Sequence, residues 1–465
     1  MNVILHLGLG SFHRAHQAAY LHELIKSGDT GWSIAGGNIR ADMADTVAAL
    51  AEQNGEYTLE TVSPAGERKY ERIRSIQKII PYEPNLAGLI EVGAQAATKI
   101  ISFTVTEAGY YLDANNKLDR GYPDLVPDLE GRTRRTIYGA VTAILKERMA
   151  RGNGPVTLLN CDNLRSNGDR FRSGLLEFLA HRGEGALAAW VEADTSCPND
   201  MVDRITPRPL PDVAERVKAA TGWDDRAPVM GESFIQWVIE DRFIAGRPAW
   251  EKVGAEMVTS VHAYEEAKIR LLNATHGCFA WAGTLKGLLY IHEDVAVPAI
   301  RQMAYDYVTD DVIPCLMSQQ RTPEHPYPID LAKYRDVVLD RFSNPHVRDT
   351  NQRVAMDGFS KIPGFILPTV RERLERGQSI AAVARLPMLF LAFLERWHAG
   401  LLPYAYQDQM MSPELGHAIC SASNPVEAFV HQRAVWAELA DDPRLMRALE
   451  LARHEIRLFE SAADS

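Results

Sequence analysis

The sequence predicts an α/β protein in which a parallel sheet with helices comes first and a mainly α-helical part follows. Three observations support this class. The apolar residues 3–7 are followed by a glycine-rich turn and then by a helical pattern. Similar strand-like segments followed by polar turns recur until about residue 257. From residue 258 onwards apolar residues repeat with a helical period and few strand candidates remain.

Length, composition and charge indicate how many domains the protein has and which partners it does not bind. A chain of 465 residues favours two domains, which we place at residues 1–257 and 258–465. The 46% hydrophobic and 24% charged residues are typical of a globular protein, and the net charge of -11 argues against nucleic-acid or anionic-membrane partners. No run of about 18 apolar residues predicts a membrane span. Five scattered cysteines without a C-x-x-C pair suit a reducing cytoplasm, and no Cys/His cluster predicts a metal site.

The first strand and its glycine turn predict a dinucleotide site. The motif G-L-G-S-F-H-R begins at Gly8, and residues 15–26 then follow a helical pattern. The first glycine permits a tight turn, and the second lets a pyrophosphate approach the backbone. A histidine stands where the third glycine of G-x-G-x-x-G is expected, so we expect looser packing of helix on strand there. This pattern predicts a Rossmann-like first domain. Its candidate cofactor contacts are Gly8, Gly10, Ser11, Phe12 and His13.

The second strand, residues 32–36, ends in G-G-N-I-R-A-D. An acidic residue beyond this strand binds the adenosine ribose of NAD, and Asp42 is the candidate. Arg40 complicates this interpretation, because an arginine here can hold the 2'-phosphate of NADP or stack on adenine. Asp42 can also be a simple cap of the helix that begins near Met43.

Polar residues follow two further predicted strands. Ligands of a doubly wound sheet bind beyond the carboxyl ends of its strands. Thr106 and Glu107, at the end of the strand 99–106, are therefore candidate neighbours of the nicotinamide. The strand 155–159 ends in N-C-D-N-L-R-S-N-G, a second polar turn at the same edge. Asp203, in the strand-like M-V-D-R-I-T-P, requires a partner or a catalytic role.

Residues 264–279, Y-E-E-A-K-I-R-L-L-N-A-T-H-G-C-F, predict a largely buried helix at the start of the second domain. At about 100° per residue, Glu265, Lys268, Asn273 and His276 share one side of it. A lysine whose pKa is lowered serves as a general base near neutral pH, and an asparagine can donate to an oxyanion. His276 can hold a neighbouring hydroxyl, and Glu265 can pass a proton towards water.

Two other interpretations of this helix remain open. Glu265 and Lys268 can be a surface ion pair on a half-exposed helix whose other polar residues cap local backbone. Tyr264 and Lys268 also match the Tyr-x-x-x-Lys dyad of short-chain dehydrogenases, in which the tyrosine is the base. That two-residue pattern is common by chance, and the glycine fingerprint and short length of those enzymes are absent here.

Five motifs together resemble one family. They are G-L-G-S-F-H-R-A-H, C-D-N-L-R-S-N-G, M-V-D-R-I-T-P, K-I-R-L-L-N-A-T-H, and R-F-S-N-P followed by S-K-I-P-G-F. Over nearly the whole chain they are similar to the mannitol dehydrogenase family of polyol-specific long-chain dehydrogenases. The resemblance implies a metal-independent, NAD-using enzyme with a Rossmann-like N-terminal domain and a mainly α-helical C-terminal domain that binds substrate.

The resemblance also implies roles for individual residues. The family pattern K-x4-N-x2-H makes Lys268 the general base, Asn273 an oxyanion donor and His276 a substrate-orienting residue. Asn163 is then the second oxyanion donor, and Glu265 belongs to the proton path. Asp42 stands where family members prefer NAD, although Ala41 replaces a residue that is acidic in some relatives. The implied substrate-binding residues are Asp203, Arg353 and Lys361.

Three further segments, S-F-T-V-T-E-A-G-Y-Y-L, G-E-S-F-I-Q-W-V-I-E-D-R-F and L-P-Y-A-Y-Q-D, are most similar to the branch that oxidises D-arabinitol to D-xylulose. We therefore expect this reaction, with oxidation of D-mannitol to D-fructose as a secondary one. A branch that reduces keto-uronates such as fructuronate or tagaturonate is one alternative, because Arg353 and Lys361 suit a carboxylate. A non-enzymatic nucleotide-binding sensor is another, although the retained Lys-Asn-His spacing argues against it.

Overall fold

The computed structural model describes residues 1–113, 117–207, 211–318 and 327–462, with the backbone alone at Glu107. The chain divides into two compact units. The first consists of Met1–Ser63 and Glu67–His262, and the second of Pro64–Gly66 and Ala263–Ser465. Each unit has its own arrangement of elements.

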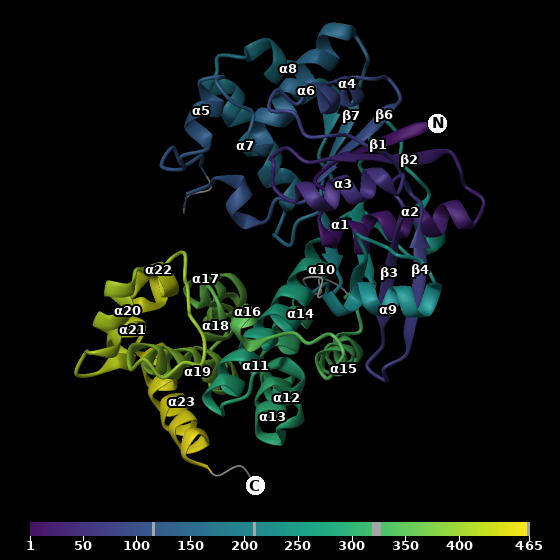
Figure 1. Ribbon diagram of the computed structural model, residues 1–465. Helices are drawn as coiled ribbons and strands as arrows, with labels where there is room; N and C mark the ends of the chain where they lie inside the picture. The colour runs from purple at the N-terminus through teal and green to yellow at the C-terminus, as the bar shows by residue number, and fades with distance from the viewer. Residues whose placement is uncertain (114–116, 208–210, 319–326, 463–465) are drawn as a thin grey trace. The chain divides into compact units, whose positions relative to one another are not determined.

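A six-stranded parallel sheet forms the centre of the first unit, with the strand order β5-β2-β1-β6-β7-β8 (Figure 1). Its strands are β1 (Asn2–Leu7), β2 (Trp32–Gly37), β5 (Ile76–Ile79), β6 (Thr98–Phe103), β7 (Val156–Asn160) and β8 (Thr195–Ser196). Every neighbouring pair is parallel. This doubly wound order, with β1 central, confirms the predicted Rossmann-like class.

Helices cover both faces of this sheet. They are α1 (Ser11–Ala15), α2 (Gln17–Lys26), α3 (Ala44–Glu52), α4 (Ala87–Gly93), α5 (Leu125–Leu129), α6 (Ile137–Arg151), α7 (Asn167–His181) and α8 (Gly185–Asp194). Helix α9 (Pro211–Thr221) instead packs on the strands Tyr57–Val62 and Arg68–Ile73 of a small sheet. Because successive strand residues point to opposite faces, β1 contributes to two cores. Leu5 and Leu7 pack with α4, α6 and α7, whereas Ile4 packs with α1, α2 and α3 (Figure 1).

Two small sheets complete the first unit, with strand orders β10-β3-β4 and β12-β11-β9. Their strands are β3 (Tyr57–Val62), β4 (Arg68–Ile73), β9 (Asp200–Asp203), β10 (Val229–Glu232), β11 (Gln236–Glu240) and β12 (Glu256–Val258). Two 3₁₀-helices lie at Glu107–Tyr110 and Trp250–Val253. β9 runs antiparallel to β11, so that Asp203 lies opposite Gln236.

The second unit is mainly helical, as predicted. Its α-helices are α10 (His262–Ala267), α11 (Ala274–Leu285), α12 (Ile291–Ala296), α13 (Pro298–Asp306), α14 (Ile313–Met317), α15 (Leu331–Phe342), α16 (Asn351–Ala355), α17 (Gly358–Lys361), α18 (Leu367–Glu375), α19 (Ala381–His398), α20 (Pro413–Cys420), α21 (Pro425–Val430), α22 (Arg433–Trp436) and α23 (Pro443–Ser461). A 3₁₀-helix spans Ala437–Asp441. The apolar helix α19 packs against both α11 and α23.

In the described part of the second unit, π-helical segments interrupt the α-helices at Lys268–Asn273, Tyr307–Val312 and Ile362–Ile366. The first of them contacts the other two. π-helices are rare and are frequently found at functional sites. The segment that joins α10 to α11 is therefore the first place to look for a site in this unit.

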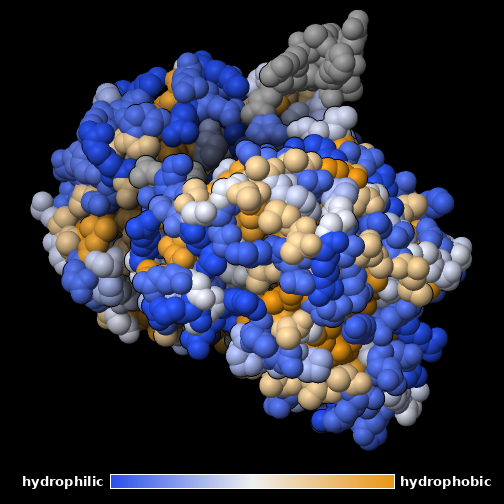
Figure 2. All heavy atoms as spheres, turned by 90° about the horizontal axis from the view of Figure 1, so that it is seen from above, coloured by the Kyte–Doolittle hydropathy of each residue, from blue (hydrophilic) through white to orange (hydrophobic). Residues whose placement is uncertain are grey.

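Hydrophilic and apolar residues are interspersed on the face drawn in Figure 2. Among the described residues, none of the helices combines the length and the apolar character that crossing a membrane requires.

Candidate active site

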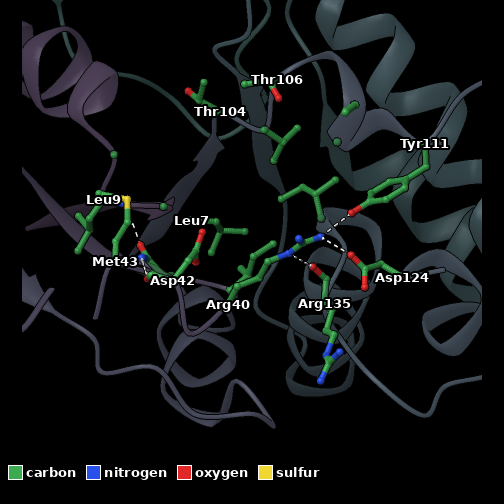
Figure 3. Close-up of a pocket in the computed structure, with 18 of the residues that line it drawn as sticks. Leu7, Leu9, Arg40, Asp42, Met43, Thr104, Thr106, Tyr111, Asp124 and Arg135 are labelled. Carbon is green, nitrogen blue, oxygen red and sulfur yellow. Dashed lines mark hydrogen bonds and ion pairs between the residues drawn. The ribbon is translucent and has the colours of Figure 1, made fainter. Parts of the chain in front are cut away.

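A cavity of about 510 Å³ opens at the carboxyl ends of β1, β2 and β6 (Figure 3). Four of the predicted cofactor contacts, Gly8, Gly10, Asp42 and Thr106, line it. Gly8 has a φ of 130°, which side-chain-bearing residues rarely adopt, and a Cβ at Gly8 or Gly10 would meet no atom within 4 Å. The space in front of both glycines is therefore open to a ligand, as a pyrophosphate site requires.

The wall beside Asp42 is held by one asparagine. The backbone N–H of Leu9 donates to Asn38 Oδ1 at 2.9 Å, and Asn38 Nδ2 donates to the carbonyl of Asp42 at 3.0 Å. The Asp42 side chain is exposed, and the N-cap of α3 is Met43, without a side-chain hydrogen bond. The interpretation of Asp42 as a helix cap is therefore wrong. Its role as a ribose acceptor stays a prediction.

His13 fills the space under the glycine turn. Its ring stacks on that of His6 with centroids 3.4 Å apart, and both side chains are buried. Burial lowers the pKa of His13 to about 3, although a hydrogen bond to Gln17 Oε1 raises it. The imidazole is therefore neutral and replaces the close helix–strand contact that a third glycine would allow. Contacts of Ser11, Phe12 and His13 with a cofactor stay predictions, and the Glu107 side chain lies outside the described residues.

Asp162 holds the cavity wall that follows β6, and the motif analysis did not single it out. Its carboxylate accepts hydrogen bonds from the backbone N–H of Val105 at 3.0 Å and of Thr106 at 2.6 Å. Tyr110 donates to its other oxygen at 3.3 Å. Burial raises the pKa of Asp162 to about 6, although the two backbone hydrogen bonds lower it. The only sequence signal was its position beside Asn163 in a dense polar turn.

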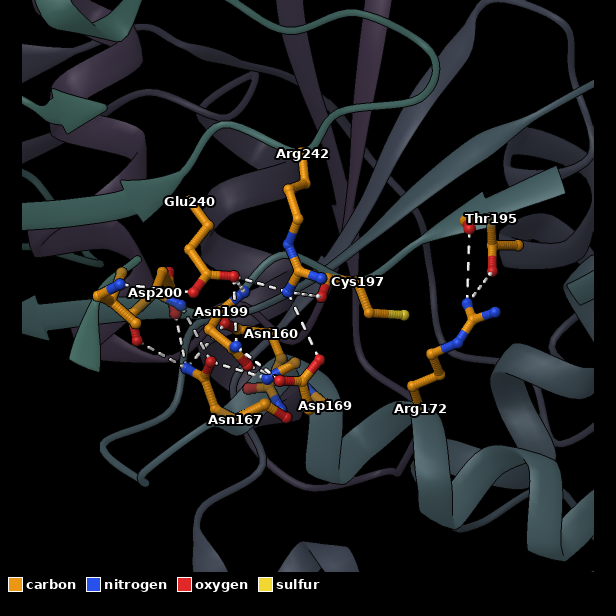
Figure 4. Close-up of polar contacts among 12 residues, drawn as sticks. Asn160, Asn167, Asp169, Arg172, Thr195, Cys197, Asn199, Asp200, Glu240 and Arg242 are labelled. Carbon is orange, nitrogen blue, oxygen red and sulfur yellow. Dashed lines mark hydrogen bonds and ion pairs between the residues drawn. The ribbon is translucent and has the colours of Figure 1, made fainter. Parts of the chain in front are cut away.

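A buried polar network fixes the same turn against β9 (Figure 4). Asn167 Nδ2 donates to Asp200 Oδ1 at 2.6 Å and to the carbonyl of Asp162 at 3.0 Å. Trp237 Nε1 donates to Asp200 Oδ2 at 2.7 Å. Burial raises the pKa of Asp200 to about 7, while these donors lower it. Because every member is bonded, the network makes the turn rigid.

The predicted lysine helix is continuous, but the expectation of a regular α-helix is wrong. Residues Lys268–Asn273 form a π-helix, so the spacing of about 100° per residue does not hold across them. Local sequence does not signal this change, since a π-helix depends on the packing around it. Lys268 and Glu265 are 5% and 4% exposed. The interpretation of these two residues as a surface pair is therefore wrong as well.

His276 lies against an acidic partner. Its Nε2 is 3.0 Å from Asp349 Oδ2, and its ring stacks on Phe342 at 4.4 Å. Burial lowers the pKa of His276, although Asp349 raises it, so the contact is an ion pair only when the imidazole takes up a proton. The same carboxylate accepts Nε and Nη2 of Arg353 at 2.7 and 2.6 Å. Burial by itself raises the pKa of Asp349, but His276 and Arg353 together bring that pKa well below its ordinary value. Asp349 is therefore an anion that positions both predicted site residues.

Lys361 lies near this group. Its Nζ donates to the carbonyl of Val354, the residue that follows Arg353. Burial lowers the pKa of Lys361 to about 8, although the nearby Asp357 raises it. With this pKa the lysine is still mostly protonated at pH 7, and it loses its charge as the pH rises through 8.

The predicted site residues are divided between the two units. Asn163 and Asp203 belong to the first unit, where Asp203 lies buried on β9. Glu265, Lys268, Asn273, His276, Arg353 and Lys361 belong to the second. Within the second unit the structure brings His276 and Arg353 together on one carboxylate, that of Asp349, and no sequence pattern predicted this shared partner. The catalytic roles of all these residues stay predictions.

Comparison with known proteins decides the family. The family model described as the mannitol dehydrogenase Rossmann domain matches residues 2–252, and the mannitol dehydrogenase C-terminal domain matches residues 260–457. The chain belongs to the mannitol dehydrogenase family. This confirms the resemblance found in the five motifs, and it makes the chain a member of an enzyme family.

Relatives within the mannitol dehydrogenase family are similar over almost the whole chain. D-Arabinitol 4-dehydrogenase of Ralstonia nicotianae is 59% identical over 462 residues, which cover 99% of this chain and 97% of the relative. D-Arabinitol 4-dehydrogenase of Klebsiella pneumoniae is 56% identical and covers 94% of each chain. Among solved structures, the Pseudomonas fluorescens mannitol 2-dehydrogenase ternary complex with NAD and D-mannitol has a TM-score of 0.84 at 32% identity, covering 98% of this chain and 92% of the other.

Proposed function

We propose that this mannitol dehydrogenase family member is an NAD-dependent polyol dehydrogenase that oxidises D-arabinitol to D-xylulose and, as a secondary reaction, D-mannitol to D-fructose. The identity of 59% to a D-arabinitol 4-dehydrogenase supports the choice of substrate. The cavity fits the cofactor, since Gly8 and Gly10 leave open space for a pyrophosphate and Asp42 lies at the same wall.

In the proposed mechanism, the chain's own residues move the proton and stabilise the charge. NAD, when bound, supplies the acceptor for the hydride. Lys268, uncharged, takes the proton of the secondary hydroxyl, and Asn163 and Asn273 donate hydrogen bonds to the oxygen as it becomes negative. Glu265, buried three residues before Lys268, passes the proton towards water. Loss of one oxyanion donor typically costs about 100- to 1000-fold in rate.

The observation that carries the choice of a polyol over a keto-uronate is the pairing of Arg353 with Asp349. The guanidinium presents Nε and Nη2 to Asp349, so one of its two-donor edges is occupied and its charge is compensated. A uronate that bound to the remaining N–H groups would face the negative charge of Asp349, which is 8% exposed and also contacts His276. Lys361, with a pKa of about 8, is still mostly protonated at pH 7, but its Nζ already donates to the carbonyl of Val354. Hydroxyl groups need no such cation.

The test is a comparison of substrates in both directions. The purified enzyme is assayed for NAD reduction with D-arabinitol, D-mannitol, D-sorbitol and xylitol, and for NADH oxidation with D-xylulose, D-fructose and fructuronate. We expect the highest kcat/KM for D-arabinitol, followed by D-mannitol, and no comparable rate with fructuronate. Faster turnover of fructuronate than of D-xylulose would overturn the polyol assignment.

A further inference from the structure

The Arg40 side chain points away from Asp42, towards the wall of the cavity that carries Tyr111, Asp124 and Arg135 (Figure 3). This residue follows β2, yet its three contacts are all with the segment between β6 and α6. Its Nη2 donates to Tyr111 Oη at 2.7 Å and lies 3.1 Å from Asp124 Oδ2, and its Nε donates to the carbonyl of Arg135 at 3.0 Å. All four residues line the cavity, as Asp42 does.

This arrangement bears on an ambiguity in the sequence. An acidic residue beyond the second strand favours the ribose hydroxyls of NAD, whereas an arginine at that place accommodates the 2'-phosphate of NADP. Here Arg40 and Asp42 are both present, two positions apart, and both line the cavity. Sequence alone gives no way to choose between them. In the structure, the Arg40 guanidinium is already paired with a carboxylate and bonded to a hydroxyl and a carbonyl oxygen.

We propose that Asp124 is a cofactor-specificity residue, which favours NAD over NADP by holding the Arg40 guanidinium away from a 2'-phosphate. The proposal rests on the NAD-dependent function proposed above and assigns the discrimination to a residue more than 80 positions from Asp42 in the sequence. Asp124 acts in two ways. It neutralises the cation that would attract the phosphate, and it holds the guanidinium on the segment between β6 and α6.

The solvent exposure of the Arg40–Asp124 ion pair indicates how much its loss should change folding stability. The side chains of Arg40 and Asp124 are 43% and 41% exposed, and exposed ion pairs contribute little to folding. Breaking the pair should therefore leave the unfolding temperature nearly unchanged. The effect on the cofactor is larger, since a phosphate monoester carries nearly two negative charges near neutral pH. We expect about a tenfold change in cofactor preference.

The experiment measures binding of NAD and NADP to the full chain by isothermal titration calorimetry, without polyol. In Asp124→Asn we expect the Kd for NADP to fall about tenfold, while the Kd for NAD changes much less. Glu130→Gln is the matched control, because it removes one exposed negative charge from the same segment outside the cavity lining. This control should leave both dissociation constants unchanged.

A second variant tests the role of Arg40 itself. Adding Arg40→Ala to Asp124→Asn should abolish the gain in NADP affinity, since the gain comes from the released guanidinium. Three results would overturn the proposal: an unchanged ratio of the two constants in Asp124→Asn, equal weakening of both cofactors, or a gain for NADP that persists without Arg40. Each leaves the proposed function standing. Failure of the wild-type chain to bind NAD would instead refute that function.

Discussion

Lys268 and Tyr264 offer competing assignments for the catalytic base. Both lie on the helix that opens the second unit, but Lys268 is almost completely buried and Tyr264 is partly exposed. We predict that Lys268→Ala lowers kcat for polyol oxidation by about 100- to 10,000-fold, the range that general base catalysis spans. NAD binding, measured by calorimetry, should be nearly unchanged, since the predicted cofactor cavity is built from the first unit.

Tyr264→Phe is the control for this prediction. It removes the hydroxyl that a short-chain dehydrogenase mechanism would need and keeps the ring, so the rate should change little. If Tyr264→Phe were the inactive variant and Lys268→Ala remained active, the tyrosine would be the base and the proposed mechanism would be wrong.

Local spacing revealed the Lys-Asn-His pattern, but it did not reveal what positions the histidine. Asp349 lies 73 positions after His276, and no local pattern marks it as a partner. The same holds for Asp124 and Arg40, which are 84 positions apart. A sequence pattern can identify side chains suited to a reaction. The acidic residues that position those side chains come from distant parts of the chain, so only the three-dimensional structure shows them.

The turn that follows β6 depends on one carboxylate. Thr106 has a φ of 61°, an unfavourable backbone conformation for a β-branched residue, and the hydrogen bond to Asp162 helps to hold it. We predict that Asp162→Asn raises the KM for NAD about tenfold, because an amide group offers one acceptor where the carboxylate offers two. Asp169→Asn, an exposed change on α7, is the control and should leave the KM for NAD unchanged.

The Asp162 carboxylate that holds this turn should also make the KM for NAD depend on pH. The pKa of Asp162 is raised to about 6, so its carboxylate is lost as the pH falls through 6. In the wild type, the KM for NAD should therefore rise between pH 7 and pH 5, and Asp162→Asn should lack this rise. A wild-type KM that stays flat over this range would show that the turn keeps its conformation without the charge.

The positions of individual strands were predicted better than the pairing of strands that are far apart in the sequence. β1, β2, β6 and β7 are short apolar runs that end in polar turns, and each was expected close to its observed place. The charged run at residues 69–74 suggested the hairpin of β3 and β4, but the pairing of β3 with β10 was not predicted, since it joins Tyr57–Val62 to Val229–Glu232 across more than 160 residues. The π-helix at Lys268–Asn273 was missed because nothing in the local pattern departs from an α-helix.

At the scale of the whole molecule, stability should depend on pH through buried carboxyl groups. Burial raises the pKa of Asp294 to about 8, although a hydrogen bond from Asn351 at 3.1 Å lowers it. A carboxyl whose pKa is raised in the folded state stabilises the fold while it is protonated, and this contribution falls progressively from about pH 4, where the unfolded chain ionises, until the folded group has ionised just above pH 8. For Asp294 alone the loss between pH 7 and pH 9 is about 1 kcal/mol.

We predict that Asp294→Asn removes this dependence, because the amide keeps the hydrogen bond from Asn351 without a titrating proton. Thermal unfolding followed at pH 6, 7, 8 and 9 should show a smaller fall in Tm for the variant and a higher Tm than wild type at pH 9. Asp336→Asn, where the side chain is 62% exposed, should follow the wild-type curve. Parallel curves for Asp294→Asn and wild type would contradict the prediction.

The π-helix between α10 and α11 limits how this region can evolve. Each hydrogen-bonded turn of a π-helix encloses one residue more than a turn of the α-helix that would replace it, and each residue of an α-helix turns the chain by about 100°. Deletion of one residue between Lys268 and Asn273 would therefore let an ordinary α-helical turn replace the wide turn, while α10 and α11 keep their mutual orientation. Insertion of a further residue would instead rotate His276 by about 100° relative to α10, so the fold should tolerate a single deletion here better than an insertion.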